Sequence, residues 1–337
     1  MKNSLKSNLP SVSIIIPCRN EGKFIGQCLD AIINQNYLKD KLEVLVIDGM
    51  SEDETRKIIK NYSEKFPFIK LLDNPKKFTN FAFNIGIKRA KGEVIMLIGA
   101  HASYERDYIS KCVKYSKEYG ADNIGGTVKI IPKTNTLIAK TIALSLSNPF
   151  GVGNAYYKSG YSKEPRWVDT VFGGCYKRGI FAKIGLFNEN LVRSQDMEFN
   201  LRLKKAGGKI LLAPDIISYY YPKSNLKDFF VHNFEDGVWI TYPLKFRIKA
   251  FCWRHLMPLI FVSSLIGTII LGTFTPIFFW LFLTIIVMYL LTNIYFSMKI
   301  AAKQKDIRYL FLIPVAFATR HIGYGLGSVW GLIKLII

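Results

Sequence analysis

The sequence predicts an α/β domain with a mostly parallel sheet, followed by C-terminal transmembrane helices. Two observations lead to this fold class. Short β-branched and aliphatic runs alternate with amphipathic stretches through the N-terminal two thirds of the chain, which is the order typical of a parallel sheet with right-handed crossovers. The C-terminal part holds unbroken apolar runs of bilayer-crossing length. We therefore expect a domain at 1–225, an interfacial amphipathic segment at 226–255 and a membrane region at 256–337.

The charge and cysteine content of the chain limit the kinds of molecule that it is expected to bind. The chain has 46 Lys and Arg against 25 Asp and Glu, and such a surplus favours nucleic acid, anionic lipid or phosphate-bearing small molecules. Its five cysteines are scattered and never spaced as Cys-x-x-Cys, so neither a disulfide framework nor a zinc site is indicated. Because Met1 to Asn8 is polar and no apolar segment follows it, we expect no cleaved signal peptide and a cytoplasmic N-terminal domain.

The elements of the predicted domain follow from their hydrophobic period. In its first half, helices separate the strands, which are expected at 11–16, 42–48, 69–72 and 94–98. The first helix opens at 20–22 and runs to 33, the second is capped at 51–55 and runs to 62, and two more follow at 80–91 and 108–119. The pattern then loosens into a strand, an apolar helix, a long Gly- and Tyr-rich loop, an extended segment, two helices and a last strand, at 124–131, 136–146, 148–163, 168–171, 178–184, 194–206 and 210–214.

The central strand at 94–98 runs directly into Gly99-Ala100-His101. In open α/β sheets, ligands bind beyond the carboxyl ends of such strands. Two other strands end in polar segments, at 17–21 and 48–53, and parallel strands bring these ends to the same edge. We therefore expect chemistry at His101 and a nucleotide at this edge.

Charged side chains at this edge suit a nucleotide. Asp48 and Asp53 can accept hydrogen bonds from base and ribose, while Arg19 and Lys88 or Arg89 can meet phosphate charge. For any single residue, helix capping and ordinary turn chemistry weigh about as much. For the group together, that alternative is much weaker.

The membrane region contains three apolar segments, at about 256–274, 277–296 and 310–335. Basic residues flank the first two on one side, so the positive-inside rule places both flanks, and the N-terminal domain with them, in the cytoplasm. The third segment holds Arg320 and His321, which are costly in lipid. They either bind a lipid pyrophosphate head group or snorkel and pack among helices.

Four segments together resemble the inverting family 2 glycosyltransferases with the GT-A fold, and among them the membrane-anchored polysaccharide enzymes of the succinoglycan glucosyltransferase type. Residues 13–21 are similar to the opening strand and Pro-x-x-Asn-Glu loop of the family. Residues 48–55 resemble its Asp-Gly-x-Ser-x-Asp-x-Thr motif on the uridine side, and 84–86 and 90–93 resemble its Asn-x-Gly and Ala-x-Gly-Glu signals. The resemblance covers roughly the first two thirds of the chain and, for that subfamily, the Arg-His and Gly-Tyr-Gly-x-Gly tail.

The resemblance implies a catalytic base at Asp196 with Gln195 beside it. Asp196 lies on the first turn of a predicted helix, and an inverting transfer needs one base to take the proton of the acceptor hydroxyl. The alternative is an aspartate favoured there by the helix dipole. Glu198 is expected to be a structural or orienting partner.

The other implied sites fall on the remaining motifs. The nucleotide-binding residues are Pro17, Arg19, Asn20, Glu21, Asp48, Asp53, Asn84, Lys88 and Ala100. The donor-sugar or acceptor site falls on Gly173, Gly174, His232 and Trp239, although a tight turn explains the glycines equally well. The Gln-x-x-Arg-Trp of processive relatives is absent, which favours a single addition per visit.

The metal position of the family falls on His101, a competent ligand for Mn²⁺ and a poorer one for Mg²⁺. Gly99 stands where the Asp-x-Asp of the family begins, so one carboxylate ligand of the divalent cation that the resemblance implies is missing. The polypeptide N-acetylgalactosaminyltransferases use an Asp-x-His at this place.

The sequence thus predicts a membrane-anchored, non-processive hexosyltransferase facing the cytoplasm. It would move a sugar with inversion from a nucleotide-diphosphate donor, with UDP favoured, to a lipid-linked or polysaccharide acceptor. Anionic membrane lipid is an expected partner and nucleic acid is not, since no nucleic-acid motif is present. The alternative is an inactive scaffold that binds nucleotide or lipid, which Gly99 favours; a transporter is disfavoured because no internal repeat is visible.

Overall fold

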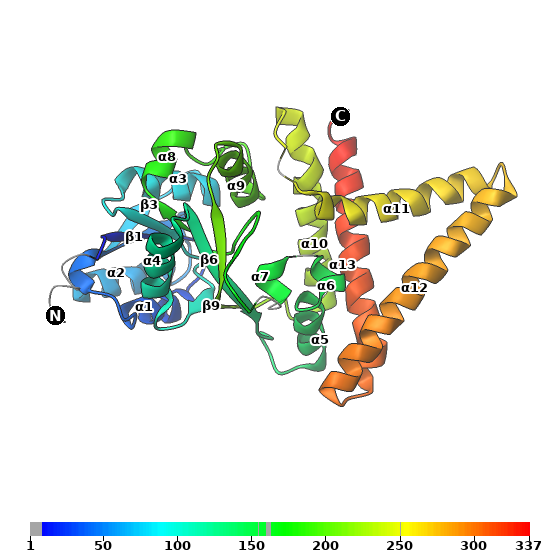
Figure 1. Cartoon of the computed structure of the whole chain (residues 1–337), viewed down its shortest axis with the longest axis horizontal. Coiled ribbons are helices and arrows are strands. Elements are labelled where there is room, and N and C mark those ends of the chain that lie inside the picture. Colours follow the sequence, from blue (N-terminus) through cyan, green and yellow to red (C-terminus); the bar gives the residue numbers. More distant parts are fainter. Residues whose placement is uncertain (1–8, 154, 160–162, 250) are drawn as a thin grey trace. The chain divides into compact units, whose positions relative to one another are not determined.

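The computed structural model describes residues 9–153, 155–159, 163–249 and 251–337 (Figure 1). The chain divides into two compact units. The first unit comprises Met1–Lys129 and Gly160–Tyr220, and the second comprises Ile130–Ser159 and Tyr221–Ile337.

The first unit is built on a mixed sheet of nine strands. One half is parallel and has the order β3-β2-β1-β4, with β1 at Val12–Cys18, β2 at Leu42–Asp48, β3 at Ile69–Asp73 and β4 at Val94–Leu97. Almost every residue of β1, β2 and β4 is buried, as expected for parallel strands covered on both faces. The predicted α/β class is confirmed, and the four strands predicted in the first half of the domain form the parallel part of a mixed sheet.

Helices connect the parallel strands, with α1 at Ile25–Ile33, α2 at Thr55–Lys65 and α3 at Thr79–Arg89. Helix α4, at Tyr108–Tyr119, follows these four strands in the chain. Helix α1 buries Ile25, Cys28, Leu29 and Ile32, the i, i+3, i+4, i+7 stripe from which it was predicted. Helix α4 ends at Gly120, whose φ of 65° is the left-handed conformation that glycine adopts without strain.

The other half of the sheet is largely antiparallel and continues the order as β4-β8-β6-β9-β5, with β7 paired to β9. The bounds are β5 Ala102–Tyr104, β6 Asn123–Ile130, β7 Arg166–Trp167, β8 Cys175–Lys177 and β9 Ile210–Tyr220. Strand β9 runs beyond the predicted end at Pro214, because its second half pairs with β5. Between β8 and β9 lie α8 at Gly179–Ile184 and α9 at Gln195–Lys205.

The second unit consists of helices, with α5 at Leu137–Leu146, α6 at Pro149–Val152, α7 at Tyr156–Ser159, α10 at Leu226–Thr241, a 3₁₀ turn at Tyr242–Phe246, α11 at Trp253–Gly272, α12 at Pro276–Gln304 and α13 at Arg308–Ile333. Among the described residues, α11 and α12 are long and apolar enough to cross a membrane. They correspond to the two segments predicted at 256–274 and 277–296. The third predicted segment forms α13, which does not meet the same criterion.

Residues 130–159 belong to the second unit, whereas the predicted domain boundary at 225 put them in the N-terminal domain. The reason is apolar packing: Leu137 and Leu144 of α5 pack against a cluster that includes Ile313 and Phe317 of α13. The loop predicted at 148–163 also contains the short helices α6 and α7. Helix α6 starts where the Asn148 side chain accepts a hydrogen bond from the Phe150 N–H (2.9 Å), an N-terminal cap followed by proline.

Helices α10 and α13 approach each other at glycines. A Cβ atom on Gly327 would lie 1.9 Å from the Phe234 carbonyl oxygen, and one on Gly237 would lie 2.0 Å from the Tyr324 carbonyl oxygen. Gly331, four residues after Gly327, leaves equally little room beside the Thr241 hydroxyl, at 2.2 Å. Small residues spaced by four thus let the two backbones come into contact.

Candidate active site

The carboxyl ends of three parallel strands align at one edge of the sheet. Cys18 of β1 lies opposite Asp48 of β2, and Asp48 lies opposite Asp73 of β3. Strand β4 ends beside Ile15, so Gly99 and the residues after it follow at the same edge. The polar segments that follow β1, β2 and β4 therefore meet at this edge, as predicted. We call this region the strand-end site.

The Asp48 carboxylate is buried and already accepts four hydrogen bonds. Its oxygens receive the Ser51 N–H (3.0 Å), the Ser51 hydroxyl, an Arg56 Nη1–H (2.6 Å) and the Cys18 thiol (3.8 Å). A carboxylate offers about four lone-pair positions, so Asp48 orders the loop that follows β2. Arg56 also pairs with Asp73 (2.8 Å). Sequence reasoning missed Arg56 and Asp73. Their positions, on the first turn of α2 and at the end of β3, could have indicated a charge pair at this edge of the sheet.

The two loops after β1 and β2 are joined by hydrogen bonds. The Asn20 N–H donates to the Ser51 hydroxyl (2.8 Å), and the Gly22 N–H donates to Asp53 Oδ2 (3.0 Å). Asp53 also accepts from the Thr55 N–H (3.0 Å), and the hydrogen bond from the Thr55 hydroxyl holds the pKa of Asp53 below its usual range. The carboxylate of Asp53 thus serves as the turn and capping group that we considered as an alternative.

Three other residues predicted to bind the nucleotide differ in their exposure. Arg19 is exposed at the strand-end site, and its stem covers Gly49 so closely that a Cβ there would lie 3.2 Å from the Arg19 Cβ. Pro17 is half-buried within β1, and Ala100 is buried after β4. Arg19 is therefore an exposed cation that this edge offers to phosphate.

His101 lies beside Glu21. The His101 Nδ1 is 3.3 Å from Glu21 Oε1, and the side chains are 51% and 23% exposed. The described residues include no group of three or more His, Cys, Asp or Glu that could hold a metal ion. An imidazole nitrogen and a carboxylate fit an ion that takes its other ligands from substrate phosphates and water, so His101 with Glu21 suits a metal shared with a diphosphate.

Gly173 and Gly174 form a turn beside the end of β4, where the Leu97 N–H donates to the Gly174 carbonyl (3.0 Å). Gly173 has a φ of +63°, and a Cβ on Gly174 would lie 2.4 Å from the Tyr176 ring. Contacts within the protein therefore require both glycines, and the tight-turn interpretation accounts for them.

Asp196 is exposed on the first turn of α9. Beneath it lies Tyr176, whose pKa is raised by burial and, to a smaller extent, by the charge of Asp196. The Tyr176 hydroxyl donates to Asn200 Oδ1 (3.2 Å), one turn further along the same helix. The neighbouring Gln195 Oε1 is buried and has no hydrogen-bond partner among the described residues. The helix thus presents a carboxylate and an unsatisfied amide oxygen together.

Helix α9 is fixed in place by Arg202. Its guanidinium bonds both Glu198 oxygens (2.6 and 3.0 Å) and the Leu186 carbonyl (2.7 Å). Phe199 stacks on Phe187, with ring centroids 4.4 Å apart. Glu198 is consequently part of the support of the helix, and Asp196 is the exposed acid.

Two predicted nucleotide residues lie elsewhere in the first unit. Lys88 is in the last turn of α3, which leads into the start of β4, so it lies at the opposite edge of the sheet. Asn84 is buried; its amide donates to the Phe187 carbonyl (2.9 Å) and accepts from the Phe187 N–H (2.9 Å). We correct both assignments, because Lys88 faces away from the strand-end site and Asn84 joins α3 to a loop.

His232 and Trp239 belong to α10 in the second unit. His232 Nε2 is 3.5 Å from Asp236 Oδ2, and the Trp239 ring packs edge-on against Tyr242 at 5.5 Å. Their role at a sugar site stays a prediction.

Comparison with known proteins agrees with this arrangement. The sequence pattern described as glycosyl transferase family 2 matches residues 13–184. The chain is 32% identical over 332 residues to a dolichyl N-acetyl-α-D-glucosaminyl phosphate 3-β-D-2,3-diacetamido-2,3-dideoxy-β-D-glucuronosyltransferase from Methanococcus voltae, covering 96% of this chain and 97% of that protein. It is 26% identical over 247 residues to the succinoglycan biosynthesis protein ExoA of Rhizobium meliloti, covering 73% and 71%.

A solved structure shares the fold. The mannosyltransferase PcManGT from Pyrobaculum calidifontis, solved in complex with GDP-Man and Mn²⁺, superposes with a TM-score of 0.59 at 18% identity, over 96% of this chain and 88% of that one. The match to the family pattern over half of the chain, together with the full-length relative, establishes the family. The chain therefore belongs to glycosyl transferase family 2, the family that its motifs resemble, and is a glycosyltransferase.

Proposed function

We propose that this glycosyltransferase moves one sugar per visit, with inversion, from a nucleotide diphosphate to a sugar carried on a polyisoprenyl phosphate. The Methanococcus relative, similar over nearly its whole length, is named for a dolichyl phosphate-linked acceptor and a β-glucuronosyl product. Inversion of an α-linked nucleotide sugar gives a β-linked product. Two apolar helices of membrane-crossing length suit an acceptor held in lipid.

The observation that carries the proposal is the exposed carboxylate of Asp196 on an anchored helix. The acceptor hydroxyl attacks the anomeric carbon, its proton passes to an Asp196 oxygen, and the bond to the diphosphate breaks on the opposite face. The salt bridge between Glu198 and Arg202 holds α9 without using Asp196. Gln195 Oε1, buried and unpartnered among the described residues, is available to accept a hydrogen bond from a substrate hydroxyl.

The strand-end site would receive the nucleotide. Its loops are already ordered by Asp48 and Asp53, so binding costs little reorganisation, and Arg19 meets the diphosphate. His101 and Glu21 would hold a divalent cation there, which would offset the charge of the leaving diphosphate. UDP is our preferred nucleotide, because residues 48–55 resemble the uridine-side motif.

The second candidate is an inactive scaffold that binds nucleotide or lipid. The observation that favours it is Gly99, where a carboxylate for the metal is missing. Against it stands the exposed carboxylate of Asp196 on the first turn of α9, where an inverting transfer would need its base.

We further propose that α11 and α12 span the cytoplasmic membrane and that the catalytic unit faces the cytoplasm. Basic residues cluster before α11 and near the end of α12, at Lys245, Arg247, Lys249, Lys299, Lys303 and Lys305. Such an excess next to membrane helices marks the cytoplasmic side.

A transfer assay tests the proposal. The purified full chain in detergent is given radiolabelled UDP- or GDP-sugars and a polyprenyl phosphate-linked sugar, with Mn²⁺, and label in the lipid extract is measured together with the anomeric configuration of the product. We expect a single added β-linked sugar. Retained configuration or several added sugars would contradict the mechanism. No transfer from any donor, with nucleotide binding intact, would favour the scaffold.

A further inference from the structure

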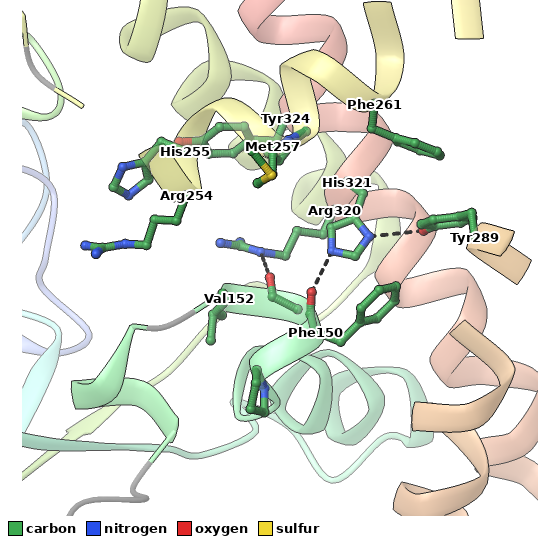
Figure 2. A pocket seen from close by; sticks show the side chains of 14 residues that line it. Phe150, Val152, Arg254, His255, Met257, Phe261, Tyr289, Arg320, His321 and Tyr324 are labelled. Atoms are coloured by element: carbon green, nitrogen blue, oxygen red, sulfur yellow. Dashed lines mark hydrogen bonds between the residues drawn. The ribbon is translucent and has the colours of Figure 1, made fainter. Parts of the chain in front are cut away.

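The second unit contains a cavity of about 370 Å³ that is not part of the strand-end site. Its walls come from α6, the first turns of α11, the middle of α12 and the middle of α13. Figure 2 shows the side chains that line it. A volume of this size suits a small ligand or one end of a larger one.

Two guanidinium groups line the cavity, those of Arg254 on α11 and Arg320 on α13, and they extend in the same direction in Figure 2. Arg320 is half-buried; its Nε–H donates to the Gly151 carbonyl and its Nη1–H to Asn233 Oδ1 (2.6 Å). Among the described residues, no acceptor meets its Nη2 and no carboxylate lies within ion-pair distance. A charge withdrawn from water without a counter-ion is costly, so the site favours an anion.

His321, the neighbour of Arg320, is occupied within the protein. Its Nε2 lies 2.9 Å from the Phe150 carbonyl oxygen and its Nδ1 lies 3.1 Å from the Tyr289 hydroxyl; both contacts are drawn in Figure 2. The ring therefore fixes α6 and α12 against α13. The sequence left two roles open for this pair, binding of a lipid head group or packing among helices. The contacts of His321 match packing, whereas those of Arg320 leave it able to bind an anion.

Much of the remaining cavity wall is apolar. Met257, Pro258 and Phe261 follow Arg254 along α11, and the rings of Phe150 and Tyr289 lie across from them. Because α11 is long and apolar enough to enter a membrane, its first turn would lie at head-group depth and Phe261 deeper. Charge at one end of the cavity and hydrocarbon along it match a molecule with a phosphate attached to an aliphatic chain.

We propose that this cavity binds the phosphate of a lipid. The guanidinium of Arg320, assisted by Arg254, contacts the phosphate oxygens, and the walls of α11 and α12 contact the first units of the chain. That the lipid is the polyisoprenyl phosphate of the acceptor rests on the proposed function. The chemistry itself, a lipid-borne phosphate, is shared by bilayer phospholipids.

Direct binding tests this site independently of catalysis. The full chain in non-ionic detergent micelles is titrated with farnesyl phosphate, and with farnesol as the uncharged match, by native mass spectrometry. We expect Arg320→Gln to weaken farnesyl phosphate binding about tenfold, as for loss of a charge-assisted hydrogen bond, and to leave farnesol unchanged. Arg320→Lys should recover part of the affinity, and Arg308→Gln, an exposed arginine on the same helix, should have no effect. Equal binding by Arg320→Gln and wild type would overturn the proposal.

Two further arms complete the test. Arg254→Gln changes a second cation of the same cavity without removing the hydrogen bonds of Arg320, so weakened binding there, at an unchanged unfolding temperature, supports the site even if Arg320→Gln does not fold. Phosphatidylglycerol that displaces farnesyl phosphate at equal concentration would overturn the acceptor assignment. Asp196→Asn should bind farnesyl phosphate as wild type does. Arg320-dependent binding without any transfer would therefore refute the proposed function and support the lipid site.

Discussion

At the strand-end site, the acidic residues have two different roles. The carboxylate oxygens of Asp48 and Asp53 accept hydrogen bonds from neighbouring residues, so these two residues order the loops that follow β1 and β2. Glu21 lies beside His101 at the strand-end site, and Asp196 is exposed on the first turn of α9. Our proposal gives metal binding to Glu21 with His101 and proton transfer to Asp196.

Gly99 offers a direct test of the metal position. A Cβ at Gly99 would meet no atom within 4 Å, so Gly99→Asp adds a carboxylate without strain. With His101 two residues away, the affinity for Mn²⁺ in the presence of UDP should rise about tenfold, since an added anionic oxygen ligand strengthens the site. Electron paramagnetic resonance of free Mn²⁺ measures this affinity. Gly179→Asp, equally unobstructed, is the control, and equal affinities in the two variants would show that no metal binds beside residue 99.

Sequence reasoning predicted the strand-end residues by type but not their role. The motif at 48–55 indicated carboxylates facing a ligand, yet the number of free acceptor positions on Asp48 depends on Arg56, which reaches back across the loop. Lys88 was misassigned for a topological reason. A residue in the last turn of a helix lies near the edge of the sheet where the next strand begins. The local sequence pattern does not show which edge of the sheet that is.

At the scale of elements, α9 and α13 are held by opposite means. A partly buried salt bridge and stacked aromatic rings fix α9, whereas contact between backbones at glycines fixes α13 against α10. Polar anchoring leaves the first turn of α9 exposed for chemistry. Close packing of α13 positions Arg320 beside the cavity.

The glycine contact of α13 predicts a specific loss of stability. In Gly327→Ala, the new methyl group would clash with the Phe234 carbonyl, and overpacking of this kind costs about 1–3 kcal/mol. Thermal unfolding of the full chain in detergent should therefore begin at a lower temperature. Gly267→Ala in α11, where a Cβ meets nothing within 4 Å, should unfold as wild type. Identical unfolding of the two variants would contradict the packing of α10 on α13.

Most elements were predictable because their period is regular. The apolar stripe of α1 and the β-branched run of β1 can be recognised from the residues of each segment alone. The extension of β9 beyond Pro214 depends on pairing with β5, more than a hundred residues earlier in the chain. The membership of α5 in the second unit depends on apolar contacts with α13. Neither partner can be recognised from the local sequence.

As a whole, the molecule combines a sheet unit with a helical unit, and its net charge of +21 fits a diphosphate substrate and an anionic lipid surface. Few residues of α11 and α12 are buried within the chain, 11% and 6% of those in the most apolar stretch of each helix. Under the proposed function, a bilayer would cover their exposed apolar residues.

This arrangement predicts which parts can be labelled from outside the cell. Thr273, in the turn between α11 and α12, should lie on the external side, so Thr273→Cys in a Cys252→Ser background should react with a membrane-impermeant maleimide in intact cells. The four remaining cysteines are buried, and burial raises the pKa of Cys28 to about 12, so background labelling should be low. Cys252 in the wild type should react only after lysis. Labelling of Cys252 in intact cells would place the catalytic unit outside.

The central claim is that Asp196 is the base of an inverting transfer. The most direct test is the single-turnover rate of Asp196→Asn with donor and lipid-linked acceptor both bound. We expect that rate to fall about 100- to 10,000-fold, the usual contribution of a general base, while nucleotide affinity is unchanged and Glu118→Gln, an exposed acid on α4, transfers like wild type. A single-turnover rate for Asp196→Asn within about threefold of wild type would contradict the account.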